Sequence, residues 1–133
     1  MGARIAGHGR RTTAHVAEPQ QIFVPVLVDI FLEAGLFVEH VAAQIDPRLL
    51  IDDQPDLVFL DVDYIDQPME SVRVARLLVP RTQIFIFAVA PSDAISRAFT
   101  AAGANVVLEK SLDRQRVVQA IHVVDRLKRH RQD

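Results

Sequence analysis

The chain has 133 residues and is 50% hydrophobic, enough for one domain with an ordinary buried core. Its 15 basic and 17 acidic residues give a net charge of -2, so no overall field attracts nucleic acid or an anionic membrane. The absence of cysteine excludes disulfides and thiolate sites, and the longest apolar run is far shorter than the ~20 residues of a membrane span. We therefore expect a cytoplasmic protein that contacts no membrane.

Short apolar stretches alternate with amphipathic ones, a pattern that predicts parallel strands joined by crossover helices. An aperiodic arm is expected at 1–11, followed by one domain over 12–133. The predicted strands are 12–18, 36–41, 57–60, 84–88 and 106–108. The predicted helices are 20–34, 47–52, 69–79, 92–102 and a last helix that begins near Ser111.

The first predicted helix contains Pro25, which conflicts with a regular helix because an internal proline removes a hydrogen bond and clashes with the preceding turn. Either the helix kinks at this proline or its regular part begins there. The helix ends naturally at Gly35. Its apolar residues are expected to face the core: Ile22, Phe23, Val26, Leu27, Ile30 and Phe31.

Polar residues mark the starts of three later helices. Asp46 before Pro47 is typical of a helix start, and Ser92 and Ser111 are expected to cap the fourth and last helices. Gly103 suits a left-handed helix end. The core-facing residues expected in the last helix are Leu112, Val117, Ala120, Ile121, Val124 and Leu127.

Opposite charges follow two of the predicted strands. Strand 57–60 runs into Asp61, and strand 106–108 is followed by Glu109 and Lys110. Ligands bind at the carboxyl ends of the strands in open α/β sheets, so Asp61 and Lys110 are candidates for one site. An aspartate at a strand end is also a common turn former, and a lysine there is often a solvated charge. The residues alone leave both interpretations open.

The chain resembles the receiver domain of bacterial response regulators over nearly all of 12–127. The likeness rests on PDLVFLD at 55–61, AAGA at 101–104 and VLEK at 107–110, in this order. It implies a doubly wound α/β fold, CheY-like, with five parallel strands in the order 2-1-3-4-5 and helices on both faces. It also implies that Asp61 holds the phosphoacceptor position and Lys110 the phosphate-binding position.

The resemblance further implies a Mg²⁺ site, because phosphoryl transfer to an aspartate gathers negative charge that a divalent cation offsets. The family places an acidic pair after the first strand, and this chain has Glu18 and Pro19 there. Asp63 lies two residues past Asp61 and can compensate for the lost ligand. Glu18, Asp61 and Asp63 are thus expected to bind Mg²⁺ weakly. A plain surface acid is the alternative role for Glu18.

Two positions depart from the family's switch. Ala88 stands where the fourth strand should end in Ser or Thr, and Val107 stands where the fifth strand should carry an aromatic residue. The hydroxyl and the ring that normally respond to phosphorylation are therefore both missing. The loss of both groups indicates an atypical receiver or a pseudo-receiver.

The resulting hypothesis is a single-domain receiver protein of two-component phosphorelay signalling, which is not an enzyme and has no catalytic residues of its own. Its expected partners for phosphotransfer are a sensor histidine kinase or a phosphotransfer protein. Its expected output partner is a protein target or a second copy of the chain, bound through the face formed by helix 92–102, strand 106–108 and the last helix. Residues expected on that face include Arg97, Asn105 and Gln119. The alternative is a phosphorylation-independent pseudo-receiver that acts as a protein-protein interaction module.

Other classes lack their sequence features. No Gly-rich or Ser/Thr-rich phosphate loop follows the first strand, and no Asp-x-His-x-x-Gly motif of cobalamin-binding domains is present. The five histidines show no metal-ligand spacing. The basic end of the last helix complements the helix dipole, which favours a structural role over nucleic-acid binding.

Overall fold

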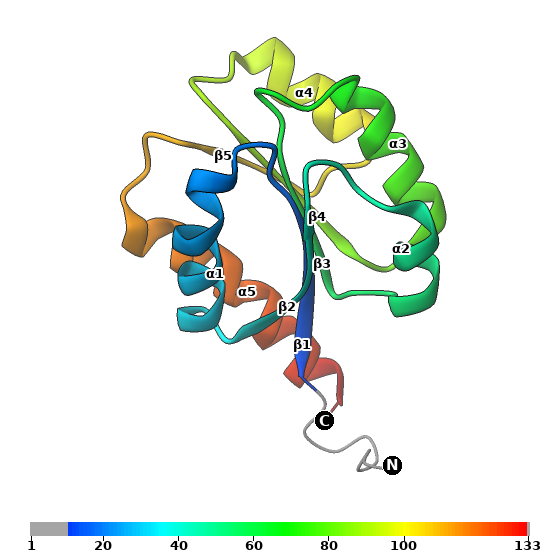
Figure 1. Cartoon of the computed structure of the whole chain (residues 1–133), viewed down its shortest axis with the longest axis vertical. Helices are drawn as coiled ribbons and strands as arrows, with labels where there is room; N and C mark the ends of the chain where they lie inside the picture. The colour runs from blue at the N-terminus through cyan, green and yellow to red at the C-terminus, as the bar shows by residue number, and fades with distance from the viewer. Residues whose placement is uncertain (1–10, 133) are drawn as a thin grey trace.

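The structure is a computed structural model that describes residues 11–132, and its five parallel strands form one sheet in the order β2-β1-β3-β4-β5 (Figure 1). This confirms the predicted doubly wound fold and its strand order. The arm expected at 1–11 lies outside the described residues apart from Arg11. Within 11–132 no helix combines the length and the apolar character needed to cross a membrane.

The elements follow the predicted order, with most ends shifted by one or two residues. The strands are β1 (Thr12–Ala17), β2 (Leu36–Ala42), β3 (Leu57–Asp61), β4 (Gln83–Ala88) and β5 (Val106–Glu109). The helices are η1 (Gln21–Phe23), α1 (Val24–Glu33), α2 (Pro47–Asp53), α3 (Pro68–Leu78), α4 (Asp93–Ala102) and α5 (Arg114–Gln132).

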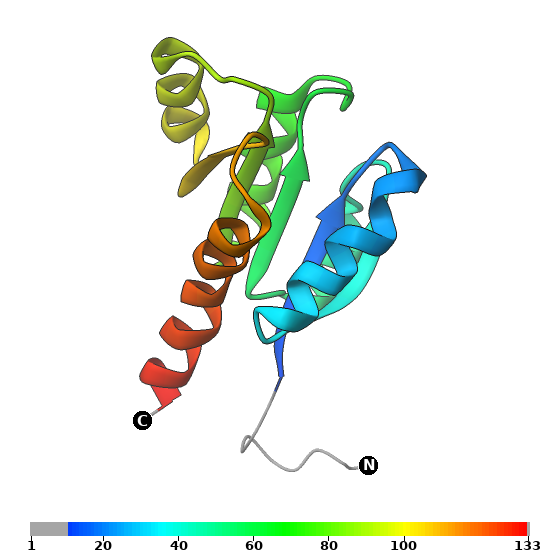
Figure 2. The same ribbon diagram turned by 90° about the vertical axis from the view of Figure 1, so that its left-hand side faces the viewer.

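Helices cover both faces of the sheet, so the chain has three layers. In Figure 1 α1 and α5 lie on the left of the strands, and α2 and α3 lie on the right; Figure 2 looks onto the α1 and α5 face. Every residue of β3 is buried, which explains its unbroken apolar sequence. The core on the first face includes Leu27, Phe31, Phe59 and Ile121, and the core on the second includes Leu50, Leu60, Val72 and Ile86.

The predicted helix starts are confirmed for α2 and α4 but wrong for α5. The Asp46 side chain accepts hydrogen bonds from two backbone N–H groups of α2, and the Ser92 hydroxyl accepts one from Ile95. For α5 the capping group is Asp113, whose carboxylate accepts a hydrogen bond from the Arg116 N–H at 2.9 Å. The Ser111 hydroxyl instead donates to the Glu109 side chain.

The beginning of α1 differs from the predicted burial. Pro25 lies in the first turn of α1, which confirms that the regular helix begins near this proline. Ile22, Phe23 and Val26 are 78%, 47% and 52% exposed, so their predicted burial is wrong. The reason is that η1 and the first turn of α1 flank an open pocket, while only the later turns pack on the sheet.

Two residues in the basic end of α5 make intramolecular ion pairs. Lys128 Nζ lies 2.9 Å from Asp56 Oδ2, and Arg129 Nε donates to Asp125 Oδ2 at 2.9 Å. Asp125 also accepts the hydroxyl hydrogen of Thr12, which fastens α5 to β1. Leu127, predicted to face the core, is 41% exposed because this end of α5 attaches through these polar contacts.

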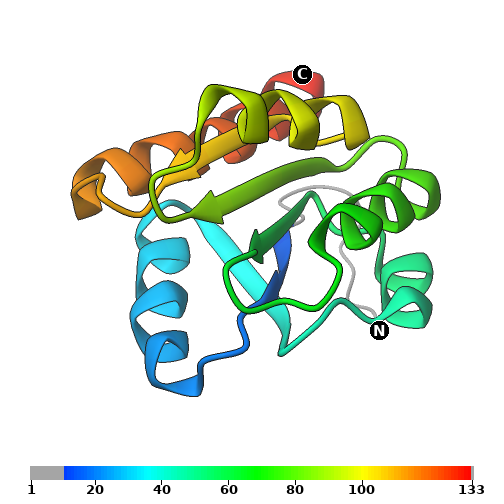
Figure 3. The same cartoon turned by 90° about the horizontal axis from the view of Figure 1, so that it is seen from above.

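All five strands run in the same direction, so their carboxyl ends meet at one edge of the sheet. Figure 3 looks down on this edge, where the loop that follows β1 leads into the start of α1 and the loop that follows β3 lies beside it. The charged residues that end β3 and follow β5 are therefore delivered to one place.

Candidate functional site

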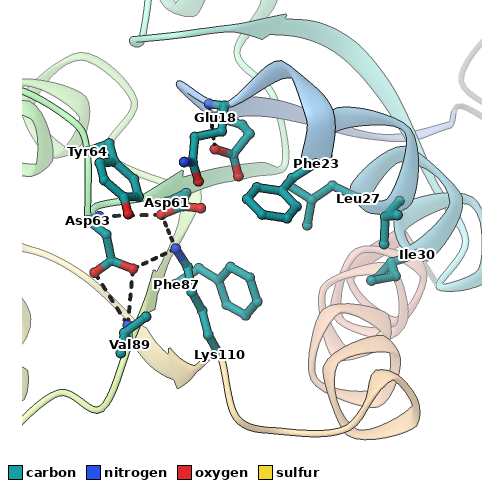
Figure 4. Close-up of a pocket in the computed structure, with 12 residues that line it drawn as sticks. Glu18, Phe23, Leu27, Ile30, Asp61, Asp63, Tyr64, Phe87, Val89 and Lys110 are labelled. Atoms are coloured by element: carbon teal, nitrogen blue, oxygen red, sulfur yellow. Dashed lines mark hydrogen bonds and ion pairs between the residues drawn. The ribbon is translucent and has the colours of Figure 1, made fainter.

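Asp61 and Lys110 form the centre of the site (Figure 4). Lys110 Nζ lies 2.6 Å from Asp61 Oδ1 and 2.5 Å from Asp63 Oδ2. The sheet brings them together because Asp61 ends β3, Lys110 follows β5, and β4 alone separates these two strands. The convergence predicted from the strand ends is therefore observed.

Glu18 completes a group of acidic residues around Asp61. It follows β1 directly, is 2% exposed, and accepts a hydrogen bond from the Gln20 N–H at 2.9 Å. Burial, followed by the hydrogen bond and charge of Asp61, raises the pKa of Glu18 to about 7. The interpretation of Glu18 as a plain surface acid is therefore wrong.

Lys110 is the cation that holds these acids together. Burial lowers its pKa, but hydrogen bonds to Asp61 and Asp63 outweigh that effect and leave the pKa above its ordinary value. Its ammonium group also lies 5.7 Å from the ring centroid of Phe87 and 6.0 Å from that of Tyr64. Lys110 is thus charged and already engaged before any ligand binds.

Asp63 links two loops of the site. Its two carboxylate oxygens accept hydrogen bonds from the Val89 N–H at 3.3 and 3.2 Å, while one of them contacts Lys110. Its own N–H donates to Asp61 Oδ1 at 3.3 Å. Asp63 therefore fastens the loop after β3 to the loop after β4, a role that sequence reasoning did not assign.

The donor chemistry of the site fits a divalent cation of the Mg²⁺ type. Glu18, Asp61 and Asp63 offer carboxylate oxygens from the ends of two strands. Burial raises the pKa of Glu18, with a smaller contribution from the neighbouring Asp61, and a bound cation would favour the ionised carboxylates. Pro19 offers no side-chain oxygen and is not among the residues that line the pocket beside Asp61. The set is one carboxylate short of the acidic pair expected after β1.

A pocket of about 620 Å³ opens beside Asp61 and Lys110. Figure 4 shows its apolar wall coming from the start of α1 and from β4. The residues of that wall are Phe23, Val26, Leu27, Ile30 and Phe87. Sequence reasoning missed this wall because it assigned the apolar side of the first helix entirely to the core. The proline in the first turn was the available signal that the helix begins late.

The two residues predicted to hold the switch positions lie on neighbouring strands, β4 and β5. Ala88 ends β4, is 4% exposed, and accepts the Lys110 N–H at its carbonyl oxygen. Val107 lies on β5, opposite Ile86 of β4, and packs against the core under α3 and α4. Neither side chain carries a hydroxyl group or an aromatic ring.

A second group of polar side chains lies away from this site and includes one of the five histidines. His15, Glu39 and Asp53 place three ligand atoms within 4.8 Å of one another. They come from β1, β2 and α2, so no sequence spacing reveals them.

No protein-family model and no curated protein matches this chain at the level of sequence. Solved structures do match it. The receiver domain of AraT, a response regulator from Geobacillus stearothermophilus, has a TM-score of 0.78 and 16% identity, covering 93% of this chain and 100% of that chain. A LuxR-family two-component response regulator from an Aurantimonas species has a TM-score of 0.77 and 24% identity, covering 86% and 85%.

A third structure is a response regulator from Burkholderia pseudomallei, solved with a phosphorylated aspartic acid, a calcium ion and citrate. It has a TM-score of 0.71 and 16% identity, covering 90% of this chain and 72% of that chain. These similarities extend over nearly all described elements at low identity. The chain therefore has the fold of response regulator receiver domains.

Proposed function

We propose that this chain is a receiver of two-component signalling, in which Asp61 accepts a phosphoryl group and Lys110 binds it. The observation that carries the proposal is the 2.6 Å contact between Lys110 Nζ and Asp61 Oδ1 at the carboxyl edge of a receiver-type sheet. The phosphorylated aspartic acid of the Burkholderia neighbour supports this chemistry by analogy. The protein would act in the cytoplasm as a binding partner and not as an enzyme with its own substrate.

The chemistry needs few groups. An Asp61 oxygen attacks the phosphorus of a phosphohistidine donor, the phosphorus–nitrogen bond breaks, and the histidine nitrogen leaves with the bonding electrons. Lys110 stabilises the negative charge on the transferred oxygens because its ammonium group already lies beside Asp61. Glu18, Asp61 and Asp63 would hold Mg²⁺, which would supply further charge stabilisation at the phosphoryl oxygens.

The expected partners bind near the site and on the α4, β5 and α5 face. A sensor histidine kinase or phosphotransfer protein must reach Asp61 through the pocket beside α1. On the output face, Arg97 and Gln119 are exposed. Asn105 is less suited to recognition because its side-chain oxygen accepts hydrogen bonds from Arg76 and from the Ile84 N–H, both at 2.7 Å.

The test is phosphotransfer from acetyl phosphate with Mg²⁺, followed by intact mass measurement. We expect the mass of one added phosphoryl group in the wild-type protein and none in Asp61→Asn. The matched control is Asp66→Asn, which removes an exposed carboxylate from the same loop and should still be phosphorylated. Equal phosphorylation of Asp61→Asn, or no phosphorylation of the wild type, would contradict the proposal.

A phosphorylation-independent pseudo-receiver is the second candidate. Ala88, Val107 and Pro19 favour it because each removes a group that the receiver mechanism normally uses. Mg²⁺ titration separates the two candidates, since only the phosphorylatable receiver requires a divalent cation at Asp61. Mg²⁺ binding that disappears in Asp61→Asn supports the receiver, and its absence in the wild type supports the interaction module.

A further inference from the structure

We infer that His15, Glu39 and Asp53 form a second metal site, suited to Zn²⁺ or a similar borderline transition ion and separate from the Mg²⁺ site proposed at Asp61. His15 Nε2 lies 2.8 Å from Asp53 Oδ2 and 3.7 Å from Glu39 Oε1. All three ligand atoms lie within 4.8 Å of one another. The group sits under α2, where β1 and β2 meet the end of that helix.

These distances suit a small tetrahedral ion. Metal–ligand distances of about 2.1 Å and tetrahedral angles put neighbouring donor atoms about 3.4 Å apart. The two distances from His15 Nε2, 2.8 and 3.7 Å, lie on either side of that value. The third separation, between the carboxylates of Glu39 and Asp53, lies within 4.8 Å, so rotations of these two exposed side chains would place all three donors around one ion. Three protein ligands leave a fourth position for water.

The chemistry of the donors selects the class of metal. An imidazole nitrogen with two carboxylates suits Zn²⁺ and its neighbours among the transition metals better than Mg²⁺, which prefers oxygen ligands only. Glu39 and Asp53 face solvent on one side, which gives an ion a way in.

Two unpartnered ring nitrogens lie beside the proposed site. His15 is 3% exposed, and its Nδ1 atom and the Nε2 atom of His40 are buried without a hydrogen-bond partner among the described residues. The two rings are neighbours, with centroids 5.4 Å apart. A plain hydrogen bond between His15 and Asp53 satisfies one ring nitrogen and leaves both of these atoms unpaired, which costs free energy.

Metal binding at His15 Nε2 would place the ring proton on Nδ1. The neighbouring His40 ring, whose Nε2 atom also lacks a partner, is the candidate acceptor for that proton. The neighbouring histidine would thus orient the ligand histidine. A bulge in β2 places the two histidines side by side. Ala14 pairs with Val38 and His15 pairs with His40, so Glu39 is an extra residue of β2.

The test is titration of the whole chain with Zn²⁺ by calorimetry, with Co²⁺ as a spectroscopic probe. The wild type should bind one equivalent. Asp53→Asn and Glu39→Gln should each weaken binding by about tenfold or more, since removing even an outer-shell partner commonly costs that much. The matched control is Asp52→Asn on the same helix, an exposed carboxylate outside the group, which should bind as the wild type does.

A second control separates this inference from the proposed function. Asp61→Asn should lose Mg²⁺ binding and phosphorylation but keep its Zn²⁺ affinity. Loss of Zn²⁺ binding in Asp61→Asn would mean that the ion occupies the proposed phosphorylation site, and it would overturn the inference. Equal Zn²⁺ affinity in Asp53→Asn, Glu39→Gln and Asp52→Asn would overturn it as well, as would no binding by the wild type.

Discussion

Glu18 should make the stability of this protein fall as the pH rises. Burial and the neighbouring Asp61 raise the pKa of Glu18 from its ordinary value of 4.5 to about 7. Between these two pH values the unfolded chain releases the Glu18 proton while the folded protein keeps it. The stability present below pH 4.5 is therefore lost as the pH rises through 7. A pKa difference of this size corresponds to about 3 kcal/mol.

Glu18→Gln removes this dependence, because glutamine is neutral at every pH and still offers a hydrogen-bond donor to Asp61. Urea unfolding of the variant and the wild type should give similar free energies near pH 4.5 and a gap of about 3 kcal/mol in favour of the variant near pH 8. Comparing the two proteins cancels the titration of all other groups. The control is Glu70→Gln, whose carboxylate is 61% exposed, and it should change stability by less than about 0.5 kcal/mol at either pH.

A stability gap that does not grow with pH would refute the reasoning, because it would mean that Glu18 ionises in the folded protein as it does in the unfolded chain. Repeating the two measurements with added Mg²⁺ gives a further comparison. A cation that binds between Glu18 and Asp61 favours the ionised carboxylates, so it should narrow the gap near pH 8.

Four further outcomes are expected. Pro19→Asp should strengthen Mg²⁺ binding about tenfold in a calorimetric titration, because it restores the second carboxylate after β1; unchanged affinity would contradict the placement of Glu18 and Pro19. Lys110→Met should lower the free energy of unfolding by about 3 kcal/mol near neutral pH, because it leaves buried carboxylates without their cation. Gly103→Ala should cost about 1–3 kcal/mol, because φ is +128° and the new Cβ would lie 2.8 Å from Arg76 Cβ; chemical denaturation measures both losses. A beryllofluoride phosphoryl mimic should shift NMR signals of the loop 89–92 more than those of α5, and large shifts throughout α4 and α5 would show a conventional switch.

The fold could be predicted because local signals agree with the global arrangement. The run 57–60 has no polar residue to place on a solvent face, and β3 is indeed buried on both faces. Asp46 and Ser92 cap helices as their positions indicate. The error at Ser111 arose because Asp113, two residues later, offers a capping carboxylate that displaces the α5 start to Arg114. Local sequence does not say which of two nearby caps will be used.

The site was predicted in part, for a physical reason. Strand-end residues such as Asp61 and Lys110 follow from topology alone, because parallel strands deliver their ends to one edge. The burial of α1 residues depends on where the helix begins relative to the sheet, which periodicity does not fix. The His15 group joins side chains of β1, β2 and the end of α2, and the bulge at Glu39 pairs His15 with His40. Neither the meeting of these elements nor the bulge can be predicted from local sequence.

If Asp61 accepts a phosphoryl group, as proposed, holding that group and responding to it are different tasks. A phosphoryl group adds roughly -1.5 to -2 charges, and opposite unit charges ~4 Å apart at an effective dielectric of ~20 attract by ~4 kcal/mol, so Lys110 can hold the group firmly. A ligand shifts a conformational equilibrium only through the difference between its interactions in the two states. Lys110 already contacts Asp61 without phosphate, and Ala88 and Val107 supply no group that would move.

The contact that phosphorylation must disturb is the one made by Asp63. A phosphoryl group on Asp61 would compete for Lys110 and would repel the Asp63 carboxylate, which now accepts both the ammonium group and the Val89 N–H. Releasing Val89 would loosen the loop that leads from β4 into α4 while the buried side chains of the sheet stay in place. The added charge would then change the conformation only at the start of α4. The rest of the output face would change only if a partner binds the loosened loop.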